Sequence, residues 1–168
     1  MSRGEFIEVV AKSMKIIAID PGLVGAGAVL DTGGDLVEVF DLPTIGEGNR
    51  RRIDAANLAD LIRAHEPYTF AMVELVNSWP KQGVASTFRF GRAHGTILGV
   101  IGALTIPVRH VSPAKSKKAL GLNGDAETSR ARAIETWPAH ADLFARKRDH
   151  NRAEAALLGL YGLKNGGV

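Results

Sequence analysis

Three carboxylates occur where separate predicted elements end or begin. Asp20 ends the apolar run 16–19, and Glu74 lies at the end of a second run, 69–75. Glu154 lies in the first turn of a predicted helix and is flanked by alanines. Carboxylates gathered from separate elements repel unless a cation lies between them, and oxygen ligands suit Mg²⁺ or Mn²⁺. The pattern predicts metal-assisted phosphodiester hydrolysis, in which two ions activate water and stabilise the leaving oxygen.

Two of these acids, Asp20 and Glu154, also have a purely structural interpretation. Asp20 is followed by Pro and Gly, a common turn sequence, so its carboxylate could do no more than open that turn. Glu154 is favoured in a first helical turn by the helix dipole, and Asp149 could be the N-cap of the same helix. Under this interpretation His150 is a surface histidine.

The hydrophobic pattern predicts an α/β fold. Strands are predicted at 15–20, 25–30, 35–42, 69–75 and 105–110, and helices at 51–65, 84–103, 112–120, 126–136 and 151–163. Three successive strands joined by short turns indicate an antiparallel meander. The whole order indicates a mixed sheet with helices on both faces. In the helix 84–103, glycines recur every three or four residues, which predicts a face that another element approaches closely.

Composition limits the classes of protein to consider. The 168 residues, 45% of them hydrophobic, suit one domain at 15–168 preceded by an extension at 1–14. Glu5 and Glu8 interrupt any signal-peptide core, and no apolar run approaches a membrane span. The absence of cysteine excludes disulfides, thiolate zinc sites and cysteine nucleophiles.

Basic residues gather in short clusters beside predicted turns or helix ends. A run of basic residues is usually a solvated face, but several in a small domain suggest an anionic partner such as nucleic acid. The clusters lie at 49–52, 115–118, 130–132 and 146–148.

Taken together, the motifs resemble those of the RuvC-type Holliday junction resolvases. The segments 16–22, 72–74, 88–95, 112–118 and 152–155 occur in that family's order. The short chain and its Asp-His-x-Arg-Ala-Glu-Ala ending resemble the family's phage and prophage branch. The resemblance implies an RNase H-like fold with a five-stranded mixed sheet, three strands antiparallel and two parallel. It also implies a homodimer that nicks four-way DNA junctions symmetrically, leaving 5′-phosphate and 3′-hydroxyl ends, in the cytoplasm of a bacterium or phage host.

The resemblance also assigns metal ligands. Asp20, Glu74 and Glu154 match family acids that would hold two Mg²⁺ or Mn²⁺ ions. Where the family usually has a fourth acid, this chain has Asn151, which offers a carbonyl oxygen but no charge. Asp149 or His150 is expected to share that role. His150 lies one helical turn before Glu154, whereas Asp149 would need non-helical backbone to reach the cluster.

Basic and aromatic residues are assigned to DNA by the same resemblance. Lys117 is expected at the scissile phosphate, where it would neutralise charge. An exposed loop aromatic such as Trp79 could stack on an unpaired base, or could equally pack beside Pro80 on the surface. The glycine-bearing helix would contribute to the dimer interface. The full set of expected DNA contacts is Trp79, Lys81, Arg89, Arg92, Lys115, Lys117, Lys118 and Arg130.

Particular features of the sequence leave alternative functions open. Asn151 is compatible with a protein that binds branched DNA but cleaves it weakly. An RNase H or YqgF-like nuclease acting on RNA would share the acids, although the basic helix at 115–118 and the run 88–95 favour a resolvase. Actin- and hexokinase-like proteins also begin with a strand, Asp and Gly, but need a second domain that 168 residues cannot supply.

Overall fold

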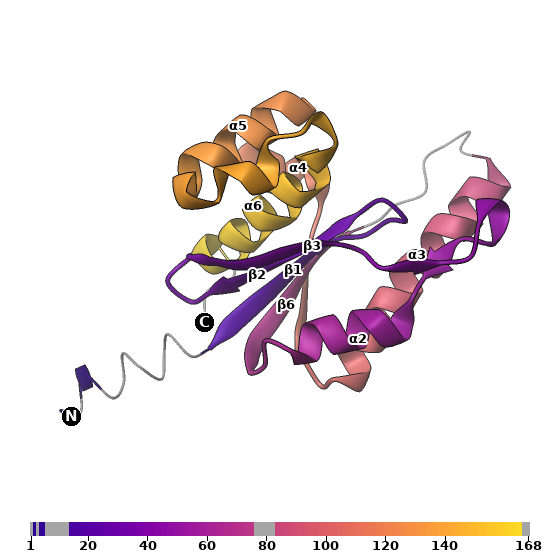
Figure 1. Cartoon of the computed structure of the whole chain (residues 1–168), viewed down its shortest axis with the longest axis horizontal. Coiled ribbons are helices and arrows are strands. Elements are labelled where there is room, and N and C mark those ends of the chain that lie inside the picture. The colour runs from indigo at the N-terminus through magenta and orange to yellow at the C-terminus, as the bar shows by residue number, and fades with distance from the viewer. Residues whose placement is uncertain (1, 3, 6–13, 76–82, 166–168) are drawn as a thin grey trace.

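A five-stranded mixed sheet forms the centre of the computed structural model, which describes residues 2, 4–5, 14–75 and 83–165 (Figure 1). Its strand order is β3-β2-β1-β6-β7. Strands β1 to β3 are antiparallel neighbours, and β6 and β7 run parallel to β1, which confirms the predicted sheet. The bounds are β1 (Lys15–Asp20), β2 (Ala26–Asp31), β3 (Leu36–Asp41), β6 (Tyr68–Glu74) and β7 (Val108–Val111).

Strand β1 is buried on both faces. Ile16 and Ala18 belong to the core on one side of the sheet, Ile17 and Ile19 belong to the core on the other, and all four are fully buried. A strand covered on both faces has a continuous apolar run rather than an alternating one. This explains why the run 16–19 before Asp20 contains no polar residue.

Two helical layers cover the sheet (Figure 1). Helices α4 (Pro113–Ala119), α5 (Ala126–Thr136) and α6 (His150–Asn165) lie on one side, and α2 (Ala55–Arg63) and α3 (Val84–Ala103) lie on the other. Short 3₁₀ turns η2 (Pro138–Phe144) and η3 (Lys147–Asp149) connect α5 to α6. Among the described residues, no helix has the length and apolarity needed to cross a membrane.

Small residues let α6 lie very close to the sheet. Ala153, Ala155 and Ala156 are fully buried. A Cβ atom at Gly159 would lie 2.5 Å from Leu30 Cδ1 and 3.3 Å from Ala18 Cβ, so only glycine fits there without displacement. This close contact fixes the start of α6, and with it Glu154, over the ends of the central strands.

The predicted helix at 51–65 is shorter in the structure. Strand β5 (Arg52–Ile53) pairs with β4 (Thr44–Ile45) in a small hairpin around the 3₁₀ turn η1 (Gly48–Arg50). Asp54 then caps α2 by accepting a hydrogen bond from the Asn57 amide. The basic run 50–52 therefore lies in this hairpin rather than in a helix.

The fifth strand also begins later than predicted. Thr105 follows α3 with a left-handed φ of 56°, and the Ile106 amide donates to the Ile101 carbonyl. Pro107 has no amide hydrogen to contribute to a strand ladder. Strand pairing therefore starts at Val108, and β7 extends to Val111.

Candidate active site

Asp20 and Glu74 project from neighbouring parallel strands at the same edge of the sheet. Ile19 of β1 is paired with Val73 of β6, so the acids that follow them lie side by side. Side chains alternate along a strand, and Ala18 and Met72, two residues earlier, belong to the core under α6. Both carboxylates therefore face the α6 side of the sheet.

Glu154 joins this edge from the first turns of α6. Its Oε1 atom lies 3.3 Å from the Lys117 Nζ atom of α4, and the Ser129 hydroxyl of α5 donates to the same oxygen at 3.3 Å. The Glu154 side chain is 20% exposed and Ser129 is fully buried. Three helices thus orient one carboxylate.

The three acids influence one another electrostatically. Burial raises the pKa of Asp20 to about 7, and the charges of Glu74 and Glu154 add to that rise while Lys117 opposes it. Burial also raises the pKa of Glu74, where Lys117 again opposes and Glu154 adds. One ammonium group does not compensate three carboxylates in this partly buried place, so the site favours an additional cation. We call Asp20, Glu74, Glu154 and Lys117 the acid cluster.

The acid cluster suits a hard divalent cation in the type and charge of its donors. Within the described ranges, no three acidic or histidine side chains converge closely enough to hold an ion in the conformation seen. Lys117 occupies the cationic position next to Glu154 instead. Ion binding therefore requires side-chain adjustment around Lys117.

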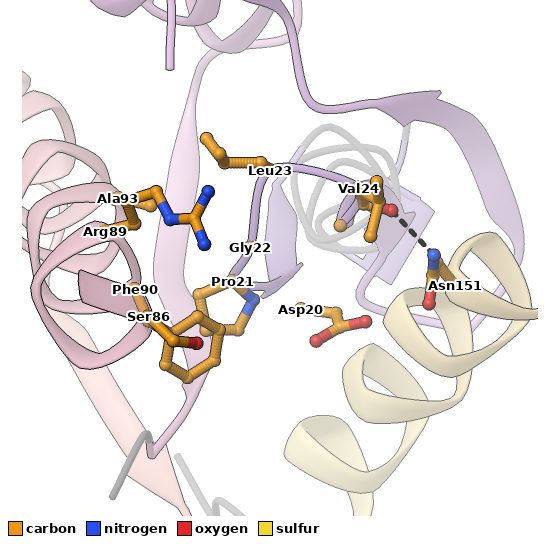
Figure 2. Close-up of a pocket in the computed structure, with 11 residues that line it drawn as sticks. Asp20, Pro21, Gly22, Leu23, Val24, Ser86, Arg89, Phe90, Ala93 and Asn151 are labelled. Atoms are coloured by element: carbon orange, nitrogen blue, oxygen red, sulfur yellow. Dashed lines mark hydrogen bonds between the residues drawn. The ribbon is translucent and has the colours of Figure 1, made fainter. Parts of the chain in front are cut away.

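The side chain of Asn151 has a structural partner. Its Nδ2 atom donates to the Val24 carbonyl in the loop between β1 and β2 at 2.6 Å (Figure 2). This bond ties the start of α6 to the loop that follows Asp20. Because the amide nitrogen faces the loop, Oδ1 is the atom that Asn151 could offer to a ligand.

The structure does not bring Asp149 into the acid cluster. Asp149 is only 2% exposed, and both of its oxygens accept hydrogen bonds from the Arg146 amide and guanidinium. Burial alone would raise the pKa of Asp149, but the Arg146 hydrogen bonds outweigh it and hold that pKa below its usual range. His150 Nδ1 lies 3.2 Å from the Lys147 carbonyl oxygen. This geometry gives no support to the expectation that Asp149 or His150 takes the place of the fourth acid as a metal ligand.

A pocket of about 540 Å³ opens beside Asp20, between the β1–β2 loop and α3 (Figure 2). Ser86, Arg89, Phe90 and Ala93 form one face of α3 and line its wall. The loop packs tightly, because a Cβ atom at Gly25 would lie 2.1 Å from the Asp20 carbonyl oxygen. The pocket places apolar walls and one guanidinium next to Asp20.

The expected DNA-binding residues fall into different environments. Lys115 and Lys118 are exposed on α4, on either side of Lys117. Arg89 donates to Asn49 at 3.4 Å, and Arg92 donates to the Arg51 carbonyl at 3.0 Å. Both arginines therefore also hold the β4–β5 hairpin against α3. Two further expected contacts lie outside the described residues: Trp79 and Lys81.

The Arg130 side chain forms hydrogen bonds and an ion pair within the protein. Its Nε atom donates to the Phe144 carbonyl at 2.8 Å, and one terminal nitrogen donates to the Ala145 carbonyl at 2.6 Å. The other terminal nitrogen is paired with Glu127 at 2.7 Å, and the Arg130 side chain is only 12% exposed. The geometry thus favours a structural role for Arg130 over the expected phosphate contact.

Ser129 is a site residue that sequence reasoning missed. No motif includes it, and serine is common on helix surfaces. One signal could have indicated it: Ser129 and Ala133 are four residues apart, which gives α5 a narrow face of small residues suited to close packing. The identity of its partner, Glu154, depends on the tertiary fold.

Comparison with curated proteins gives relatives that match most of this chain. It is 30% identical over 156 residues to the crossover junction endodeoxyribonuclease RuvC of Synechococcus sp. (strain CC9902), covering 89% of this chain and 97% of that relative. It is 35% identical over 127 residues to the RuvC of Nitratidesulfovibrio vulgaris (strain DP4), covering 70% and 72% respectively. No protein-family profile matches the chain.

Comparison with solved structures identifies the same fold. The T. thermophilus RuvC in complex with Holliday junction substrate superposes with a TM-score of 0.64 at 17% identity, over 91% of this chain and 97% of that one. The yeast mitochondrial Holliday junction resolvase Ydc2 gives a TM-score of 0.54 at 13% identity, over 98% and 87% respectively. At these identities the likeness concerns the RNase H-like fold alone.

Proposed function

The chain belongs to the family of RuvC crossover junction endodeoxyribonucleases, and we propose that it resolves four-way DNA junctions at the acid cluster. The observation that carries this proposal is the meeting of Asp20, Glu74 and Glu154 at one sheet edge, with Lys117 among them. Cleavage leaves 5′-phosphate and 3′-hydroxyl ends. The reaction takes place in the cytoplasm of a bacterium or of a phage host. A phage or prophage origin stays a prediction.

Asp20, Glu74 and Glu154 are the residues that would hold Mg²⁺ or Mn²⁺, with Asn151 Oδ1 as the neutral fourth donor. Two bound ions would supply an activated water and charge stabilisation at the leaving oxygen. Asp20 and Glu74 hold their carboxylates on rigid strand ends, which fixes the position of the scissile phosphate. Lys117, which pairs with Glu154 at 3.3 Å without the ions, would neutralise the phosphate.

A homodimer is part of the proposal, and α3 supplies its interface. Among the described residues, a Cβ atom at Gly91, Gly95, Gly99 or Gly102 would have open space around it, so none of those residues packs against this glycine face. On the same side of the helix, Val84 is 87% exposed and Phe88 is 68% exposed. A small-residue stripe flanked by exposed apolar side chains suits another helix at close range, and a twofold dimer matches a twofold junction.

Nicking of a labelled four-way junction tests the proposal. The chain is incubated with Mg²⁺ or Mn²⁺ and the junction, beside linear duplex and an RNA–DNA hybrid. We expect paired cuts in the junction only, and their loss in Asp20→Asn. Asp60→Asn is the matched control, because Asp60 is an exposed acid on α2 that pairs with Arg63. Cutting of the hybrid instead would show an RNase H-like or YqgF-like activity.

Asn151 favours a second candidate function, a junction-binding protein with weak cleavage. An amide in place of a carboxylate lowers the negative charge available for a second ion. Under this alternative the chain binds junctions but nicks them slowly, and Asn151→Asp increases the rate. If the unaltered chain cuts as fast as Asn151→Asp, the alternative is wrong.

A further inference from the structure

A second pocket lies on the other side of the β1–β2 loop from the pocket beside Asp20. It has a volume of about 560 Å³ and shares Leu23, Val24, Gly25 and Asn151 with the first. Its remaining lining is mostly charged. These residues are Asp41, Leu42, Arg51, Arg148, Asp149 and His150.

The acids of this pocket are already neutralised by arginines that do not line it. Arg152 donates to both oxygens of Asp41 at 2.7 and 2.8 Å, and Arg146 holds Asp149 at 2.9 to 3.1 Å. The hydrogen bond from Arg152 holds the pKa of Asp41 below its usual range. Bidentate arginine–carboxylate pairs are strong and directional, so these acids are not available to the pocket's own arginines.

Arg51 and Arg148 therefore give the pocket a net positive charge. Arg51 donates from Nε to the Thr44 hydroxyl at 3.1 Å, and Arg148 is exposed. Within the described ranges, neither forms an ion pair with an acid. The backbone carbonyl of Arg51 accepts a hydrogen bond from Arg92 of α3, so the hairpin that presents this guanidinium is anchored.

We propose that this second pocket binds backbone phosphates of the DNA arm that lies next to the scissile phosphate. The inference rests on the proposed function, because it places the scissile phosphate at the acid cluster. Guanidinium groups match phosphate because they are positively charged and their forked N–H donors can bond two phosphate oxygens at once. Val24, 69% exposed, forms a ridge between the two pockets. A strand that crosses this ridge from Asp20 would meet Arg51 and Arg148.

Junction affinity and its salt dependence test this assignment. Binding of a fluorescent four-way junction is measured by anisotropy in EDTA for the chain, Arg51→Gln and Arg148→Gln. Each substitution is expected to weaken binding about threefold to tenfold and to lower the slope of log K against log salt by about one. Arg63→Gln is the matched control, an exposed arginine at the end of α2, where β6 begins, at the sheet end opposite the acid cluster. Its affinity and slope should match those of the unaltered chain.

The outcomes separate this inference from the proposed function. If the unaltered chain cuts junctions but both arginine variants keep its affinity and slope, only the second pocket's assignment is wrong. If the unaltered chain neither binds nor cuts junctions, the proposed function itself fails. Thermal unfolding confirms that the variants fold. A parallel titration uses inorganic phosphate: stabilisation of the chain that is lost in the variants, with junction affinity unchanged, would indicate a free-anion site and overturn the DNA assignment.

Discussion

At the scale of single residues, Asp20 carries its charge in an unfavourable place. Its carboxyl group has an ordinary pKa of 3.8 and a pKa of about 7 in the fold, where burial and two other acids disfavour ionisation. The folded form thus binds this proton more tightly than the unfolded chain does. Without metal, the free energy of unfolding therefore falls as pH rises from about 4 to about 7, and acidification restores it.

The first prediction concerns this pH dependence. Thermal unfolding in EDTA at about pH 5 and about pH 8 should show the chain more stable at the lower pH, relative to Asp20→Asn. The variant lacks the titrating group, so the difference between the two proteins isolates the contribution of Asp20. Parallel pH profiles for both proteins would contradict the prediction. Added Mn²⁺ should stabilise the unaltered chain at high pH, because the ion compensates the ionised carboxylates.

The second residue-scale prediction concerns Ser129. Ser129→Ala removes the hydroxyl that donates to Glu154. If the hydrogen bond that orients Glu154 contributes about 1 kcal/mol to the stability of the transition state, junction nicking should slow about fivefold. Single-turnover cleavage rates measure the effect. Thr136→Ala is the control on the same helix, since the Thr136 hydroxyl donates only to the Arg132 carbonyl of α5. Equal rates for Ser129→Ala and the unaltered chain would mean that Glu154 is oriented without it.

At the scale of elements, Arg130 joins α5 to the segment that precedes α6. Arg130→Gln frees the carbonyls of Phe144 and Ala145, so we expect a loss of about 1 to 3 kcal/mol in the free energy of unfolding. Junction affinity should remain unchanged if the role is structural. Denaturant unfolding and anisotropy measure the two quantities separately. Arg132→Gln, at an exposed arginine paired with Glu135, should change neither. If Arg130→Gln binds the junction more weakly but keeps its full stability, Arg130 contacts a DNA phosphate, as expected from the sequence.

Elements with strong local signals could be predicted from the sequence, and small paired elements could not. The bounds of α3 and α5 agree with the predicted helices. Glycine spacing indicated α3, and the turn residues 123–125 and Pro138 marked the ends of α5. The β4–β5 hairpin has only two residues on each side, and its pairing depends on anchoring by Arg89 and Arg92. The proximity of Asp20 and Glu74 could be predicted, because each acid lies at the end of a predicted strand. The pairing of Asp149 with Arg146 depends on packing around 3₁₀ turns that leave no periodic pattern.

At the scale of the whole molecule, the two faces of α3 have different surroundings. One face, which includes Arg89 and Phe90, lines the pocket beside Asp20, and the glycine face has open space around it as far as the described residues go. Pairing two copies through the glycine faces would therefore leave both pockets accessible. A junction presents two equivalent strands for cutting, so each copy can act on one of them.

The last prediction tests that arrangement. Gly95→Arg adds a long charged side chain where the single chain has open space, so the fold should be retained while close helix pairing is blocked. Sedimentation should show a dimer for the unaltered chain and a monomer for the variant. Junction cuts in the variant should lose their pairing, because each monomer acts independently. Arg63→Glu on α2 is the control and should leave the dimer intact. A dimeric Gly95→Arg protein would place the interface on another surface, whereas a monomeric unaltered chain that still makes paired cuts would mean that DNA alone brings the two copies together.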